Sequence, residues 1–305
     1  MAYSRRMATG VLAAAVILGQ SLVGGLPCSR SAAAEQPVKT AERSRTEGDR
    51  AGWTVSESEN FRIWSRLSQR ETGKLAEHCW LLCRRLRSTW LNGKSGPDWN
   101  PKCEVVVHRT LAEYNLALGR EQDRSVGCTT IRVQNGRVVL RRIDLRADAA
   151  DWRSSALPHE LAHVVLADRF AAHQLPHWVN EGVAVLAESE AKRADRLDAL
   201  RRAEKSGLIF DTADLMLLNR QPALGYHDAF YGQSAALVEF LLSRGSPQQF
   251  LAFVEDALAN NYDKALQTAY GIDGVDELAR IAEQHTPSLA AQARRLRVEL
   301  VQAGK

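Results

Sequence analysis

The chain lacks a strong net charge, and this limits its partners. The formal charge is +4 over 305 residues. Arg5, Arg6 and Arg30 lie in the first 34 residues, which contain no acid, so 37 basic and 36 acidic side chains remain in the rest. A chain this close to neutrality has no general electrostatic attraction to nucleic acid or to an anionic membrane. We therefore expect no nucleic-acid partner.

Motifs of other enzyme classes and architectures are also missing. The sequence has no glycine-rich phosphate loop and no Ser/His/Asp motif. It has no convincing internal repeat and no low-complexity tract. With 45% hydrophobic residues the chain has enough apolar material for a real core. A globular fold of one large or two modest domains is therefore expected.

The N-terminus has the order of a targeting segment. Arg5 and Arg6 precede an apolar run from Gly10 to Leu26, and Ala32-Ala33-Ala34 supplies a small-residue cleavage site. A run of about 17 residues is at the short limit for a membrane-spanning helix, so a retained anchor is the alternative. We expect residues 1–34 to be a signal peptide or N-terminal anchor. The protein is then exported to the periplasm or outside the cell, with membrane contact only if the segment is retained.

Four cysteines remain after this segment: Cys79, Cys83, Cys103 and Cys128. An even number in an oxidising compartment favours up to two disulfides, with three connectivities. Cys79 and Cys83 are four residues apart on an expected helix, so each is expected to bridge to Cys103 or Cys128. A thiolate zinc site is the weaker alternative, because the sequence has no CxxC pair.

The polar residues 35–52 are expected to be a disordered linker. The pattern of apolar residues then divides the chain into an α/β lobe at 53–147 and a helical lobe at 148–305. We expect residues 53–290 to form one domain. Its fold class is α+β, with a small mixed sheet in the N-terminal lobe and an all-helical C-terminal lobe.

Period-two and helical spacing place the elements of the first lobe. The expected strands and helices are Phe61–Trp64, Gln69–Trp90, Cys103–His108, Leu111–Leu118, Val126–Val133 and Val138–Leu145. The last two strands flank Asn135-Gly136, a hairpin signal because both turn positions need a positive φ. Beyond Asp148 the strand signal stops.

The segment His159-Glu160-Leu161-Ala162-His163 opens the helical lobe. His159 and His163 lie one helical turn apart on the same face, so both imidazoles can reach one metal ion. Glu160, offset by one residue, can face the open coordination position and act as a base. Pro158 must lie in the first turn of this helix. The alternative is a surface helix with two unrelated histidines.

A second segment follows 18 positions after His163. Glu181 stands there in the sequence Trp178-Val179-Asn180-Glu181-Gly182. We expect Asn180 to cap a helix, Glu181 to be the third metal ligand, and Gly182 to let the two helices approach closely. Two histidines and a glutamate with one open position are typical of a catalytic zinc site. One Zn²⁺ per chain is therefore expected.

HELAH followed by W-x-N-E-G-x-A resembles the gluzincin metallopeptidases, the clan of thermolysin and the alanyl-type aminopeptidases. The chain looks closest to the peptidase MA-like domains of exported bacterial proteins, and the similarity covers about residues 55–285. It implies peptide or protein substrates and a zinc site in the cleft between the lobes. In that reading His159, His163 and Glu181 bind zinc, and Glu160 is general base and acid.

The resemblance also implies a role for Tyr231, which would donate a hydrogen bond to the oxyanion of the tetrahedral intermediate. A buried core tyrosine is the alternative, and Tyr226 and His227 compete for the role. A strand over the cleft, 126–133 or 138–145, would pair with an extended substrate.

Two departures from the family matter. The acid expected four residues after the third ligand is replaced by Val185, so the residue that orients His159 is left open. No G-x-M-E-N segment precedes HELAH, so an endopeptidase is favoured over an aminopeptidase. A catalytically inactive binding or scaffold protein of the same fold is the alternative function.

Overall fold

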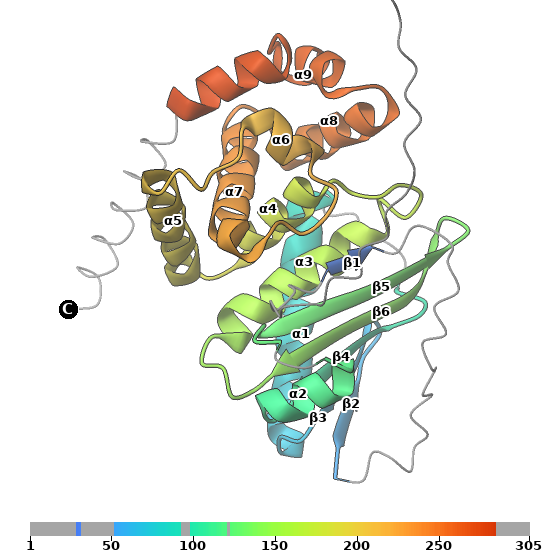
Figure 1. Cartoon of the computed structure of the whole chain (residues 1–305). Coiled ribbons are helices and arrows are strands. Elements are labelled where there is room, and N and C mark those ends of the chain that lie inside the picture. The colour runs from blue at the N-terminus through green and yellow to red at the C-terminus, as the bar shows by residue number, and fades with distance from the viewer. Residues whose placement is uncertain (1–28, 32–51, 93–97, 121–122, 285–305) are drawn as a thin grey trace, which may run out of the picture.

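A computed structural model of the chain describes residues 29–31, 52–92, 98–120 and 123–284 (Figure 1). The expected signal segment at 1–34 and linker at 35–52 lie outside these residues, apart from 29–31 and Gly52. The fold is α+β, with a mixed sheet followed by a mostly helical C-terminal region.

The sheet combines parallel and antiparallel strands. Its main strands are β2 (Thr54–Glu57), β3 (Phe61–Ser65), β4 (Cys103–His108), β5 (Gly127–Gln134) and β6 (Arg137–Arg146). The short β1 (Ser29–Ser31) extends it, giving the order β1-β5-β6-β4-β3-β2. The pairs β3–β4, β4–β6 and β1–β5 are parallel, whereas β2–β3 and β5–β6 are antiparallel. The strand β2 was not predicted from the sequence.

The places of the hairpin strands β5 and β6 in the sheet decide which of them a substrate could pair with. Asn135 and Gly136 have φ values of 50° and 68°, as the sequence predicted. Because β6 lies between β5 and β4, it has no open edge for a substrate. Of the two candidate strands, β5 lies nearer the edge of the sheet, where only the three-residue β1 pairs with it, along Thr129–Ile131.

Helices cover both faces of the sheet. The capping box of Ser68 and Glu71 starts α1 (Gln69–Trp90), which packs against β2 and β3. The short α2 (Leu111–Leu118) packs against β4 and β6 on the opposite face, in front of the sheet in Figure 1. Both helices have the bounds predicted from the sequence.

The expected cysteine pairing is wrong. Cys79, Cys83 and Cys103 are free and buried in the main core, between α1 and the sheet. Cys128 lies on the other side of the sheet beside Tyr114, and it is disulfide-bonded, so its bridge goes to none of these three. Helical spacing placed Cys79 and Cys83 on one face correctly, but it gave no information about what faced them.

Among the described residues after Arg146, all regular structure is helical. A π-helical turn (Trp152–Ala156) leads into α3 (Leu157–Ala167). The elements that follow are α4 (His177–Ala187), α5 (Glu190–Lys205), α6 (Thr212–Leu217), a 3-10 turn (Leu224–Tyr226), α7 (His227–Ser243), α8 (Pro247–Ala259) and α9 (Tyr262–Tyr270). Figure 1 shows α3 between the sheet and these helices, and it packs against β5, α1 and α4. Within the described ranges no helix has both the length and the apolarity needed to cross a membrane.

Gly182 of α4 makes a close helix contact in this region. A Cβ at Gly182 would lie 2.5 Å from the Ser234 carbonyl oxygen and 2.6 Å from Val238 Cγ2, both on α7. The expected close approach therefore joins α4 to α7, and not α4 to α3. This contact determines how closely α4 packs against α7.

Gly182→Ala should lower the free energy of unfolding by about 1–3 kcal/mol, because backbone atoms of α7 cannot move aside easily. Gly73→Ala is the matched control, since Gly73 is also helical but has nothing within 4 Å of an added Cβ. That control should be neutral or slightly stabilising. Thermal unfolding of the two metal-free variants measures both, and equal melting temperatures would contradict the role of Gly182.

Candidate active site

The helix α3 is buried on all sides, which explains its apolar sequence. It lies between the sheet and the helical region, and His159, Glu160 and His163 are at most 9% exposed. Pro158 is in the first turn of α3, as expected, where the preceding π-helical turn passes into the α-helix. A buried helix that still carries three polar groups needs a partner for each of them.

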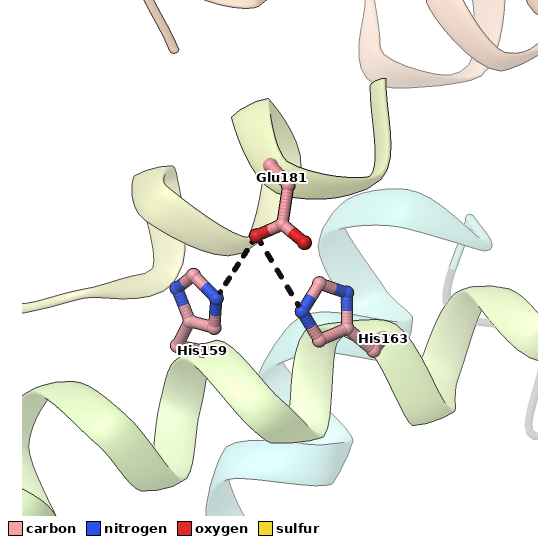
Figure 2. A group of neighbouring side chains, drawn as sticks. All are labelled: His159, His163 and Glu181. Atoms are coloured by element: carbon pink, nitrogen blue, oxygen red, sulfur yellow. Dashed lines mark ion pairs between the residues drawn. The ribbon is translucent and has the colours of Figure 1, made fainter. Parts of the chain in front are cut away.

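Three of the predicted residues meet at one point (Figure 2). His159 Nε2 lies 3.3 Å from Glu181 Oε2, and His163 Nε2 lies 3.9 Å from the same oxygen. One ligand atom from each residue lies within 4.8 Å of the other two. The rings project from α3, and the carboxylate projects toward them from α4.

This group suits a metal such as zinc. Tetrahedral zinc with bonds of about 2.0–2.2 Å places its ligand atoms about 3.3–3.6 Å apart, close to the two measured separations. Each histidine uses Nδ1 for a hydrogen bond elsewhere, which leaves Nε2 directed at Glu181. Two imidazoles and one carboxylate are also the donor set of catalytic zinc sites.

Glu188 holds His159, and the sequence argument missed it. Its Oε1 lies 3.0 Å from His159 Nδ1, and Arg196 donates to the same carboxylate at 3.0 and 3.3 Å. Burial raises the pKa of Glu188, but His159 and Arg196 outweigh burial and lower it, so the carboxylate is ionised. The expected position four residues after Glu181 is the buried Val185. Glu188 is the C-cap residue of α4, seven positions after Glu181, and that spacing of about two helical turns was the available signal.

His163 is held by Asn180. The Asn180 Oδ1 oxygen lies 2.9 Å from His163 Nδ1. The expectation that Asn180 caps the helix is wrong, because α4 begins at His177 after Pro176. Its amide serves the metal site and not the helix end. Both rings therefore have a fixed orientation and a fixed tautomer.

Glu160 contacts β5. Its Oε2 accepts a hydrogen bond from the Thr129 hydroxyl at 2.7 Å. Burial raises the pKa of Glu160 to about 7, against the opposing influence of His159 and Thr129. A Cβ at Gly127 would lie 2.8 Å from Glu160 Cγ, so only glycine leaves room for this side chain. The Thr129 hydroxyl and the space left by Gly127 therefore position the carboxylate of Glu160.

Tyr231 of α7 faces the same site. Its ring centroid is 6.4 Å from that of His159, and the Arg196 guanidinium lies 4.6 Å above its ring. Burial and the nearby Glu181 raise the pKa of Tyr231 well above its ordinary value, so its hydroxyl stays protonated. Of its two competitors, Tyr226 packs on Phe210, and His227 bonds to the Pro222 carbonyl oxygen.

All five residues singled out from the sequence line one pocket with a volume of about 790 Å³. The same pocket includes Glu188, Arg196 and Gly127. A carboxylate with a raised pKa, a protonated hydroxyl and a group of metal-ligating atoms therefore face a common space. Such an arrangement can bind a metal ion, accept a proton and donate a hydrogen bond to an oxygen.

Comparison with known protein families agrees with this geometry. Residues 132–282, about half of the chain, match the family model of the Peptidase MA superfamily. The chain belongs to this superfamily, which confirms the family predicted from HELAH and the segment around Glu181. Membership indicates a peptidase-like hydrolase, and peptidases of this clan are typically zinc-dependent. No curated protein matches the chain.

Glu188→Gln should weaken zinc binding about 10- to 100-fold, because the neutral amide orients His159 less firmly and leaves Arg196 without its counter-charge. Competition with a chromogenic chelator measures the affinity. Glu190→Gln is the control, since Glu190 is an exposed carboxylate two residues away. Equal affinities of the two variants would contradict the positioning role.

Proposed function

We propose that the protein is an exported, zinc-dependent metallopeptidase with one zinc per chain, held by His159, His163 and Glu181. The observation that carries the proposal is the convergence of these ligand atoms beside Glu160 in one pocket of a Peptidase MA domain. Export rests on the targeting order of residues 1–34, whose Ser29–Ser31 would be removed by cleavage after Ala34.

The division of chemistry follows from the side chains. A bound zinc ion lowers the pKa of a coordinated water to about 7 and polarises a carbonyl group. Glu160 accepts the proton of the attacking water and returns it to the leaving amine. Its raised pKa suits both directions of transfer near neutral pH. Thr129 holds the carboxylate in place during this exchange.

Tyr231 acts on the oxygen of the scissile carbonyl. Its protonated hydroxyl donates a hydrogen bond as negative charge develops on that oxygen. Arg196 lies over the ring of Tyr231 and donates a hydrogen bond to Glu188, which in turn contacts His159. The same arginine therefore helps to position both the oxyanion donor and one metal ligand.

The substrate is a peptide or protein segment in extended form. The outer edge of β5 runs along the pocket, and its pairing with β1 illustrates that this edge accepts an extended chain. An endopeptidase is favoured, because no segment resembling the amino-terminus grip of the aminopeptidases precedes HELAH.

An inactive scaffold of the same fold is the alternative. Its motivation was the missing acid at Val185. Glu188 now supplies a carboxylate to His159 from one turn further along the chain, so the observation that favoured this alternative no longer supports it.

Glu160→Gln should reduce hydrolysis of a peptide library at least about 100-fold while about one zinc per chain is retained. The amide cannot accept the proton, but it is not a ligand. Glu181→Ala should lose both zinc and hydrolysis, and Glu190→Gln should lose neither. Metal analysis and mass-spectrometric detection of products give the two measurements. Unchanged turnover in Glu160→Gln would exclude the mechanism, and a zinc-loaded wild type that cleaves nothing would favour the scaffold.

Tyr231→Phe should lower kcat by about 10²–10³ with little change in zinc content or melting temperature, because the ring and its contact with Arg196 remain. Tyr226→Phe removes a hydroxyl outside the pocket and should leave kcat unchanged. If both variants turn over a cleaved peptide equally fast, Tyr231 is only a core residue.

A further inference from the structure

A second hollow adjoins the metal ligands on the other side of His163. It is a shallow hollow of about 510 Å³ when the space open to solvent is included, and it lies between β5 and the C-terminal half of α3. His163 lines both this hollow and the pocket that contains Glu160. The two hollows are therefore neighbouring parts of one cleft, and we call the second one the apolar pocket.

The lining of the apolar pocket is mostly apolar, and its polar members are Thr129, His163, His173 and Asn180. Among the described residues none of its lining side chains is Asp, Glu, Lys or Arg. The apolar contributions come from Ile131, Val133, Leu166, Phe170 and Leu175. Ile131 and Val133 are only half-buried on β5, so aliphatic surface faces open space. The neighbouring pocket, in contrast, contains Asp151, Lys192 and Arg196 as well as the catalytic carboxylates.

The position of Glu160 indicates in which direction a bound peptide runs along the cleft. In peptide hydrolysis the leaving amine receives its proton from the general acid, so the amine side lies toward Glu160. Glu160 and Gly127 line the charged pocket and not the apolar one. The acyl side of the substrate then extends along β5 in the direction of Ile131 and Val133.

We propose that the apolar pocket binds the side chain of the residue that contributes the scissile carbonyl, and selects a large aliphatic or aromatic one there. This inference rests on the proposed function. His163 lines this pocket and is also a metal ligand. The pocket therefore lies next to the bond that would be hydrolysed. A charged side chain would lose hydration in this pocket without gaining an oppositely charged Asp, Glu, Lys or Arg among the lining residues.

The test compares peptides that are identical except at the carbonyl-donating residue, which is Leu, Phe, Asp or Lys. A parent peptide comes from the library digest, and kcat/KM is measured for each. We expect Leu and Phe to exceed Asp and Lys at least about tenfold. Ile131→Glu should abolish this preference and raise Lys relative to Leu. A flat profile, or an apolar preference only on the amine side, would overturn the proposal.

Val139→Glu is the matched control, because Val139 is a β-branched residue of the same hairpin, 38% exposed and outside the pocket. It should keep the wild-type profile. If Ile131→Glu retains zinc and also keeps that profile, the pocket does not select the side chain of the substrate.

A binding measurement separates failure of the pocket from failure of the proposed function. If the zinc-loaded wild type cleaves no peptide, the proposed function fails, and titration with N-acetylphenylalanine and N-acetylaspartate tests the pocket alone. Tighter binding of N-acetylphenylalanine that is lost in Ile131→Glu and kept in Val139→Glu supports the pocket. Equal binding of both compounds to the wild type overturns it.

Discussion

The structure depends on the burial of three polar groups, His159, His163 and Glu181, at one point between α3 and α4. Buried imidazoles and carboxylates are costly unless each has a partner. The surrounding residues meet this requirement: Glu188 and Asn180 bind the two Nδ1 atoms, and Arg196 compensates the charge of Glu188. The second ring nitrogen of each histidine, Nε2, then faces Glu181. The contacts that satisfy these polar groups therefore also bring together a set of atoms that could hold a metal ion.

Helix α3 connects this site to both parts of the fold. On one side it meets β5, where Thr129 and the missing side chain of Gly127 set the position of Glu160. On the other side it meets α4, whose depth depends on the contact of Gly182 with α7. Tyr231 reaches the same pocket from α7. Glu160 and the two histidines come from α3, Glu181 from α4 and Tyr231 from α7, so the spacing between these three groups is fixed by helix packing.

The same helix separates two chemical environments within one cleft. Toward its N-terminus the cleft is charged and contains His159, Glu160 and Glu181. Toward its C-terminus the cleft is mostly aliphatic and aromatic. The division follows the chain near β5, because Val126 and Gly127 line the charged pocket whereas Thr129, Ile131 and Val133 line the apolar one.

The sequence by itself determined whatever depends on short-range spacing. The i, i+4 pair of His159 and His163, the Asn135-Gly136 hairpin and the bounds of α1 and α2 follow from local periodicity and turn chemistry. The family followed from Glu181 in its local segment. Only the tertiary structure decided what lies opposite each side chain. It left Cys79, Cys83 and Cys103 as thiols, turned Asn180 from a cap into a partner of His163, and chose Glu188 over the position of Val185. A one-dimensional pattern gives the face on which a residue lies, whereas its partner is chosen by the packing of segments distant in the chain.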